Sequence, residues 1–193
     1  MPSHANQNSV VIVSGLPRSG TSLLMQMLAA GGLPLLTDGV RQADDHNRCG
    51  YHELEAVKRT KTDASWLADA PGKVVKLVYL LLYDLPSDYQ YRVVFLQRKL
   101  EEVLASQKIM LQRQGKPSGT DDATLLRIFQ KELAKVDQWL RSQPNFSLLD
   151  VDYNQLVAQP QLQAARINAF LGGRLNVAAM AAAVDPAQYR NRM

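Results

Sequence analysis

A short apolar segment that leads through a glycine-rich loop into a helical pattern is the feature that most limits the fold. Residues 9–14, SVVIVS, are apolar and β-branched, which predicts a strand buried on both faces of a parallel sheet. Two glycines then interrupt the run within residues 15–20. Apolar side chains recur at helical spacing in residues 21–30, and Gly31-Gly32 supplies a helix stop. The chain therefore predicts strand, loop and helix in direct succession.

Three further apolar runs predict additional strands. The runs cover residues 73–82, 91–97 and 146–150, and a turn at 85–88 separates the first two. An alternative for the first run is that it becomes helical after Val78. Four strands that alternate with helical patterns are typical of parallel sheets with crossover helices.

Apolar stripes and capping signals predict the remaining helices. One is expected from about His52 to Thr60, one from Leu100 to near Gly115, and a long one that Thr120 caps. Asp152 and Gln155 resemble a capping box for a short helix. The next helix is expected to open at Pro160 and to end at Gly172-Gly173, and an Ala-rich helix is expected over 177–184.

Together these elements predict an α/β fold. We expect a three-layer sandwich with a central parallel sheet of four or five strands, helices on both faces, and a P-loop NTPase-like arrangement. No repeat or linker divides the chain, so residues 1–193 are expected to form one domain, with loosely ordered tails at 1–8 and 186–193. Ligands of such sheets bind beyond the carboxyl ends of the strands, which directs attention to Gly15–Ser22, Lys76 and Arg98.

Composition excludes several classes of function. The net charge of +4 comes from 22 basic and 18 acidic residues that are interspersed, which favours a small polyanionic ligand over nucleic acid. Cys49 is the single cysteine, and the three histidines show no metal-binding spacing, so neither a disulfide nor a metal site is expected. Apolar runs are too short to span a membrane, and the polar N-terminal residues lack a secretory signal. These features predict a cytoplasmic protein.

Residues 15–22, GLPRSGTS, carry the strongest chemical signal. They have the two glycines and final hydroxyl of a phosphate-binding loop, but Thr21 stands at the lysine position and Arg18 supplies the positive charge. Backbone N–H groups in such a loop, together with the helix N-terminus, can hold phosphate or sulfate oxygens. The missing lysine argues against ATP hydrolysis and ordinary kinase chemistry. An ordinary glycine turn is the structural alternative.

Four segments in order resemble sulfotransferases that use 3′-phosphoadenylyl sulfate (PAPS). Residues 17–21, PRSGT, match the family's donor loop, and residues 93–107 resemble its segment with an Arg at a strand end and a Ser eight residues later. Residues 152–160 and 170–172 are similar to its late Tyr–Leu–Pro pattern and the next helix end. The resemblance implies donor-binding roles for Pro17, Arg18, Ser19, Gly20, Thr21, Ser22, Arg98, Ser106 and Tyr153. Within this set, Arg98 and Ser106 are expected at the 3′-phosphate and Tyr153 near the adenine.

The candidate catalytic residues are chosen by comparing this chain with two variants of the family's motifs. Many small-molecule members carry Lys-Thr-His after the second strand, whereas this chain reads Lys76-Leu77-Val78 and lacks that histidine base. Residues 47–53, NRCGYHE, resemble a segment of other members in which a Glu serves as base. The resemblance therefore implies Glu53 as base, with Lys76 at the sulfate and Arg18 stabilising the transferred group. His52 and His46 are the reserve candidates.

Each assignment has a structural alternative. Arg98 could pair with Glu101 or Glu102 at the surface, and Tyr153 could be a core residue. Glu53 could be a first-turn helix residue, and Lys76 could be a strand-end lysine in water. Two tail arginines, Arg190 and Arg192, could reach the phosphates, although a frayed terminus is the expected state.

The sequence as a whole predicts a sulfotransferase. It would move a sulfuryl group from PAPS to a hydroxyl or amine of an unidentified acceptor, release adenosine 3′,5′-bisphosphate (PAP), and use no metal. A phosphotransferase of the same fold and a non-catalytic nucleotide-binding module are the alternatives. Residues 34–70 and 112–120 are expected to shape the acceptor pocket, but they show no recognisable chemical code.

Overall fold

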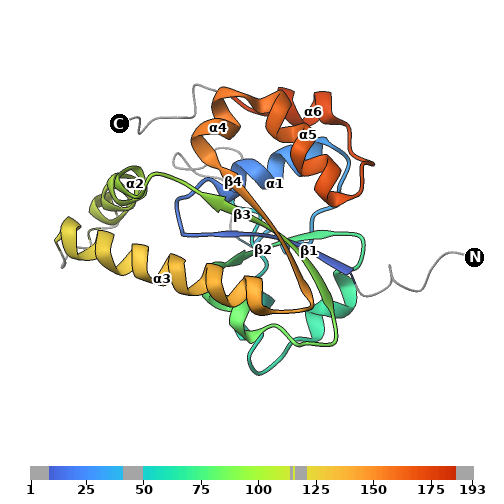
Figure 1. The fold of residues 1–193 in the computed structure, drawn as a ribbon, viewed down its shortest axis with the longest axis horizontal. Helices are drawn as coiled ribbons and strands as arrows, with labels where there is room; N and C mark the ends of the chain where they lie inside the picture. Colours follow the sequence, from blue (N-terminus) through green and yellow to red (C-terminus); the bar gives the residue numbers. More distant parts are fainter. Residues whose placement is uncertain (1–8, 41–49, 114, 116–120, 186–193) are drawn as a thin grey trace, which may run out of the picture.

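A four-stranded parallel sheet runs through the middle of the protein (Figure 1). The computed structural model describes residues 9–40, 50–113, 115 and 121–185. The strand order is β2-β1-β3-β4, and all three neighbouring pairs are parallel. The strands are β1 (Ser9–Gly15), β2 (Val74–Val78), β3 (Gln90–Gln97) and β4 (Phe146–Asp152). This confirms the predicted parallel sheet and its four strands.

Helices cover both faces of the sheet, which makes the predicted three-layer sandwich (Figure 1). One face packs against α1 (Thr21–Ala30), α4 (Tyr153–Ala158), α5 (Pro160–Leu171) and α6 (Val177–Ala182). The other face packs against α2 (Leu100–Arg113), α3 (Asp122–Ser142) and three short 3₁₀-helices. Neighbouring residues of β1 point to opposite cores: Ile12 joins the second face and Val13 the first. Both are fully buried, as expected for a strand covered on both sides.

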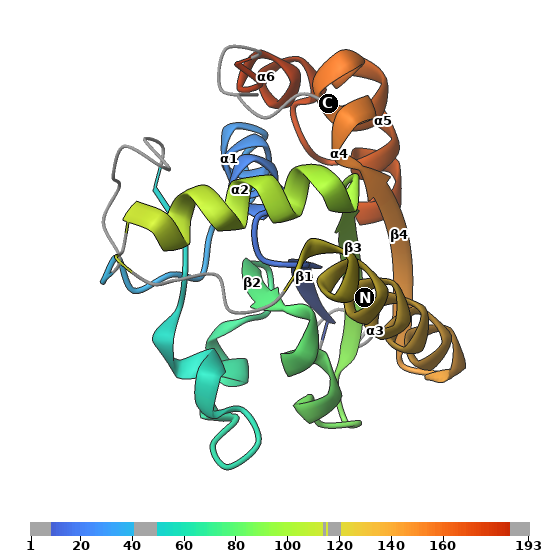
Figure 2. The same ribbon diagram turned by 90° about the vertical axis from the view of Figure 1, so that its left-hand side faces the viewer.

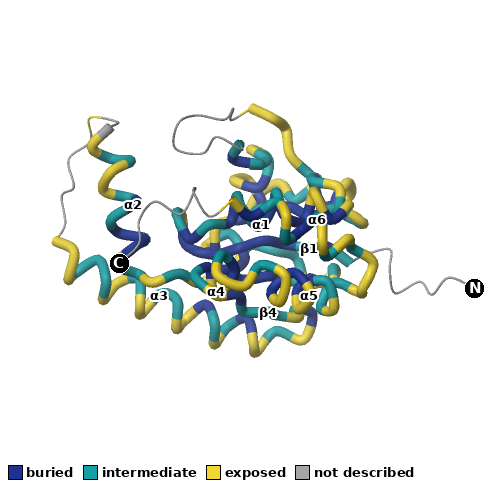
Figure 3. Tube along the Cα trace, turned by 90° about the horizontal axis from the view of Figure 1, so that it is seen from above, coloured by how far each residue is buried: buried dark blue, intermediate teal, exposed yellow. Residues whose placement is uncertain are grey.

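The long helix α3 shows why an amphipathic stripe was a reliable signal. Val136 and Leu140 are buried against the sheet, while exposed and intermediate residues alternate along the rest of the helix (Figure 3). The N-cap is Asp121, whose side chain accepts the Thr124 N–H at 2.9 Å. The prediction that Thr120 caps α3 is therefore wrong by one residue, and Thr120 itself lies outside the described residues.

Local signals are confirmed at the later helices. Asp152 accepts the Gln155 N–H at 2.8 Å and caps α4. Pro160 opens α5. Proline has no backbone N–H, but an N–H in the first turn of a helix has no intrahelical partner, so no hydrogen bond is lost. Gly172 ends α5 with φ 106°, a left-handed conformation that glycine adopts without strain.

Residues 50–85 depart most from the prediction. The expected helix over 52–60 is wrong, because only the 3₁₀-helix η2 (Glu55–Arg59) forms there and residues 50–54 have no regular structure. A second 3₁₀-helix, η3 (Ser65–Asp69), was not predicted. The third, η4 (Tyr79–Asp84), confirms the alternative that the run turns helical after Val78. No helix in the described part of the chain is long and apolar enough to cross a membrane.

Candidate active site

Strand order selects one place in the sheet where a ligand would bind. The chain leaves β1 toward β2 on one side, whereas it leaves β3 toward β4 on the other side. The two connections therefore diverge between β1 and β3, and open α/β sheets bind ligands in the crevice at such a point. Residues 16–20 follow β1 and Arg98 follows β3, so both lie at this edge. Figure 2 shows the molecule from the side on which α2 lies.

The loop after β1 has the backbone shape of an anion site. Gly20 is the N-cap of α1 with φ 101°, and no side chain caps the helix. Arg18 also has a positive φ of 74°, which is uncommon for a residue with a side chain and often marks a functional loop. Buried Ser19 has a hydroxyl with no hydrogen-bond partner among the described residues. An unsatisfied buried hydroxyl and an uncapped helix N-terminus fit an oxyanion ligand.

Two hydrogen bonds join the loop to the segment after β3. Arg18 donates from Nε to Ser106 Oγ at 3.0 Å, across 88 residues of sequence. Arg98 donates from Nη1 to the Arg18 carbonyl oxygen at 3.3 Å. The structure thus brings together the two motifs that were predicted to bind the two ends of one nucleotide.

Arg98 forms an ion pair, although not at the surface. Its Nε donates to Glu102 Oε2 at 2.8 Å, and the two side chains are 7% and 0% exposed. The other carboxylate oxygen of Glu102, Oε1, accepts from Asn154 Nδ2 at 2.9 Å. Sequence reasoning named Glu102 only as a surface partner and missed Asn154. The signals were present, since Glu102 is four residues after Arg98 and Asn154 follows Tyr153.

Tyr153 packs directly on the loop that follows β1. The guanidinium carbon of Arg98 lies over the Tyr153 ring, 4.5 Å from the ring centroid. On the loop side, a Cβ added to Gly20 would overlap the same ring. Burial raises the pKa of the Tyr153 hydroxyl. The core alternative for this tyrosine therefore describes its packing in the structure, and contact with an adenine stays a prediction.

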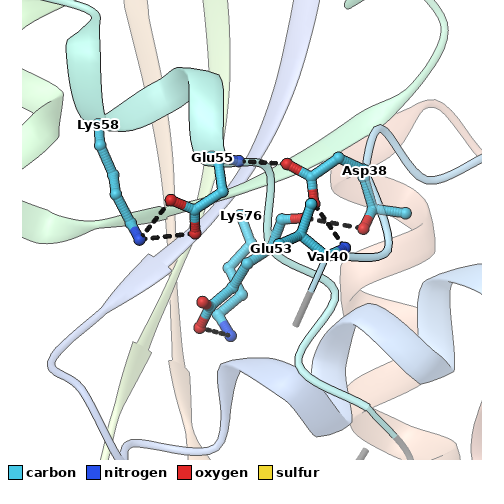
Figure 4. Close-up of polar contacts among 7 residues, drawn as sticks. Asp38, Val40, Glu53, Glu55, Lys58 and Lys76 are labelled. Carbon is cyan, nitrogen blue, oxygen red and sulfur yellow. Dashed lines mark hydrogen bonds and ion pairs between the residues drawn. The ribbon is translucent and has the colours of Figure 1, made fainter. Parts of the chain in front are cut away.

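A second polar group lies beside the first turn of α1 (Figure 4). Lys76 donates from Nζ to the Tyr51 carbonyl oxygen at 2.8 Å, to Ser22 Oγ at 3.3 Å and to Glu53 Oε1 at 3.4 Å. Lys76 lies within β2 opposite Val13, and its side chain is only 11% exposed. The alternative of a strand-end lysine in water is therefore wrong. Through Lys76, Glu53 is linked to Ser22 in the first turn of α1.

The backbone of Glu53 is held by Thr37 and Asp38 rather than by a helix (Figure 4). Its carbonyl accepts from Thr37 Oγ1 at 2.8 Å and from the Asp38 N–H at 3.3 Å. Asp38 in turn accepts the Glu55 N–H at 2.6 Å, and this hydrogen bond is the main cause that holds the pKa of Asp38 below its usual value. The expectation that Glu53 opens a helix is wrong, and Asp38 was not predicted to have a role.

The remaining candidates are placed only in part. His52 has φ 50° and is partly buried beside Glu53. His46, Cys49, Arg190 and Arg192 lie outside the described residues. In the part of the chain that the structure describes, no group of three or more His, Cys, Asp or Glu side chains could hold a metal ion.

Comparison with protein families identifies the kind of protein that carries this site. The model described as Sulfotransferase family matches residues 53–176, well over half of the chain. This chain belongs to the sulfotransferase family. The match covers Glu53, Lys76, Arg98, Ser106 and Tyr153 but does not include the glycine loop, so the loop is an independent observation.

Solved structures support the fold of this sulfotransferase. The sulfotransferase domain of the olefin synthase of Synechococcus PCC 7002 is 18% identical with a TM-score of 0.60, and the alignment covers 97% of this chain and 88% of that one. Retinol dehydratase in complex with androsterone and the inactive cofactor PAP is 18% identical with a TM-score of 0.55, over 95% and 64% of the two chains. The sulfotransferase domain of the curacin biosynthetic pathway is 16% identical with a TM-score of 0.50, over 84% and 73%. No curated protein sequence matches the chain.

Proposed function

We propose that this sulfotransferase moves a sulfuryl group from PAPS to a hydroxyl or amine of its acceptor and releases PAP. One observation carries the proposal. The loop after β1 and the Arg98–Ser106 segment after β3 meet through two hydrogen bonds at the point where the sheet connections diverge. A donor with a phosphosulfate at one end and a 3′-phosphate at the other requires two adjacent anion sites. Retinol dehydratase, which has a similar fold, was solved with PAP.

The donor would lie along the loop and the start of α2. Residues 17–22 would hold the phosphosulfate with backbone N–H groups and the hydroxyls of Ser19, Thr21 and Ser22. Arg98 and Ser106 would hold the 3′-phosphate, because an arginine presents a planar set of donors to phosphate oxygens. The buried Ser19 hydroxyl, which has no partner among the described residues, fits a ligand with anionic oxygens.

The acceptor would approach from the side of Glu53. We assign Glu53 as the base that takes the acceptor proton while the acceptor oxygen or nitrogen bonds to sulfur. The bond between sulfur and the 5′-phosphate oxygen breaks at the same time, and PAP leaves with that electron pair. Lys76, which contacts both Glu53 and Ser22, would face the sulfuryl group, and Arg18 would stabilise its spreading negative charge.

Calorimetry with PAP and ADP tests the donor assignment. We expect the protein to bind PAP more tightly than ADP, and Arg98→Ala to weaken PAP binding by about 1.5–3 kcal/mol, the usual worth of a charged hydrogen bond. Arg98→Lys keeps the charge and serves as the matched variant, because Ala leaves buried Glu102 without its ion-pair partner. Equal affinity of the parent protein for both nucleotides would contradict the 3′-phosphate site.

The proposal includes three predictions from the sequence. They are a single domain over residues 1–193, a cytoplasmic location, and sulfuryl transfer that needs no divalent ion. We expect EDTA to leave transfer unchanged. Activity lost in EDTA and restored by magnesium would favour the phosphotransferase alternative. PAPS binding with no transfer to any acceptor would favour the non-catalytic module.

A further inference from the structure

We propose that Glu102 and Asn154 are positioning residues that fix the Arg98 guanidinium and thereby set the preference for nucleotides with a 3′-phosphate. The inference rests on the proposed function, since it assumes that Arg98 meets that phosphate. It assigns a role to two residues for which the sequence motifs predict none.

Burial of Glu102 is the first argument. Its side chain is 0% exposed, and a carboxylate without access to water is strongly unfavourable unless charged or hydrogen-bonding partners compensate it. Each oxygen has such a partner: Arg98 Nε is at 2.8 Å from Oε2 and Asn154 Nδ2 is at 2.9 Å from Oε1. The carboxylate is therefore fixed from two sides, which makes it a rigid anchor for Arg98.

Contacts on the guanidinium supply the second argument. Glu102 accepts from Nε, the Arg18 carbonyl accepts from Nη1 at 3.3 Å, and the Tyr153 ring lies 4.5 Å from the guanidinium carbon. Two edge contacts and one face contact define both the position and the plane of the group. A preorganised arginine loses less rotamer freedom when a ligand binds, and this raises affinity for a phosphate that it contacts.

The elements that carry the anchor connect it to the rest of the site. Glu102 lies one helical turn before Ser106 on α2, so one helix carries both the anchor and the Ser106 hydroxyl. Asn154 follows Tyr153 in α4 on the opposite face of the sheet. The Glu102–Asn154 hydrogen bond therefore joins the two helical layers where β3 and β4 end.

Nucleotide binding by matched variants tests the proposal. Glu102→Gln keeps the size of the side chain and removes its charge, and Asn154→Ala removes the hydrogen bond to Glu102 but keeps the ion pair with Arg98. We expect each variant to weaken PAP binding by about tenfold and ADP binding by less than about threefold, the order expected when one buried polar partner is lost. Glu101→Gln is the control, because Glu101 is an exposed carboxylate on the same helix. It should bind both nucleotides as the parent does.

A double-mutant cycle separates positioning from a general effect on folding. In an Arg98→Ala background, Glu102→Gln should cause no further change in the ratio of PAP to ADP affinity, because the arginine that it positions is absent. At saturating PAPS, turnover of Glu102→Gln should stay near the parental value while KM for PAPS rises. Asn154→Ala provides the same comparison if Glu102→Gln folds poorly by circular dichroism.

Three results are decisive. A reduced PAP preference in the Glu102 and Asn154 variants, but not in the Glu101 variant, supports the proposal. A parent that prefers PAP together with variants that keep the same ratio overturns the positioning role and leaves the proposed function intact. A parent without any preference for PAP overturns both, because no 3′-phosphate site would exist.

Discussion

Two ion pairs at the same edge of the sheet differ in how firmly the protein holds them. The arginine group, which consists of Arg98, Glu102 and Asn154, has a 2.8 Å ion pair whose carboxylate is 0% exposed. The lysine group, which consists of Glu53 and Lys76, has a 3.4 Å pair whose carboxylate is 24% exposed. A rigid, buried arginine suits recognition of a fixed phosphate, whereas a base must remain reachable by an acceptor and able to take its proton.

The supporting structure differs in the same way. In the arginine group, Glu102 and Asn154 lie on the regular helices α2 and α4, and Arg98 lies in the two-residue connection between β3 and α2. The lysine group combines a residue of β2 with the irregular residues 50–54, which Thr37 and Asp38 hold through backbone contacts (Figure 4). Binding is therefore assigned to the most regular part of the site and proton transfer to the least regular part. The following experiments test that division.

The largest effect is expected for the base. Glu53→Gln keeps the size of the side chain and removes its basicity, so turnover should fall by about 10²- to 10⁴-fold while PAP affinity changes little. Steady-state kinetics with PAPS and calorimetry with PAP measure the two quantities. Glu55→Gln is the control, because this exposed carboxylate two residues later pairs with Lys58. Parental turnover by the Glu53 variant would direct attention to His52.

The second prediction concerns Arg18, which contacts the segment that carries the arginine group through Ser106 and is assigned to the transferred sulfuryl group. Arg18→Ala should lower turnover by about a hundredfold or more, comparable to the loss of one preorganised donor to a developing charge. Arg18→Lys keeps the positive charge and should retain part of the activity. If single-turnover measurements at saturating PAPS showed the parental rate for Arg18→Ala, Arg18 would have no role in the chemical step.

Packing beneath the arginine group can be disturbed without removing a charge. Gly20→Ala should lower the free energy of unfolding by about 2 kcal/mol, because the new methyl would overlap the Tyr153 ring. Gly32→Ala is the matched control, since Gly32 also has a positive φ but its Cβ would meet nothing within 4 Å. Urea denaturation of both variants isolates the overlap with Tyr153. Equal losses would show that backbone strain alone is responsible.

The smallest effect is expected from Asp38, which supports the lysine group. Its pKa is lowered by hydrogen bonds from backbone N–H groups, so its contribution to stability is present above the ordinary Asp pKa. That contribution is lost as the pH falls through the lowered pKa. Asp38→Asn should therefore reduce the melting temperature by about 2 °C at neutral pH, and less in acid. Thermal scans from pH 7 to pH 3 measure the difference, and a gap that widened in acid would contradict the role.

Local signals explain why much of the fold could be predicted. Each helix signal acts on the helical turn next to it: Asp152 caps the start of α4, Pro160 opens α5 and Gly172 ends α5. The β1–loop–α1 unit is likewise contiguous in sequence. The predicted helix over residues 52–60 failed because a tertiary contact competes there: the Glu53 carbonyl, which an α-helix would pair with the N–H of Val57, accepts from Thr37 Oγ1 and the Asp38 N–H. His52 has a positive φ, which also interrupts a right-handed helix.

By itself, the sequence determined the succession of strands and helices along the chain, the glycine loop, and the placement of Arg98 at a strand end with Ser106 on the next helix. Each of these depends on residues close together in the chain. Only the tertiary structure decided that Asn154 meets Glu102 across 52 residues, that Arg18 meets Ser106 across 88, and that Lys76 links Glu53 to the loop. The physical reason is that a hydrogen bond needs its two atoms within about 3.5 Å, and for distant residues the packing of helices on the sheet sets that distance.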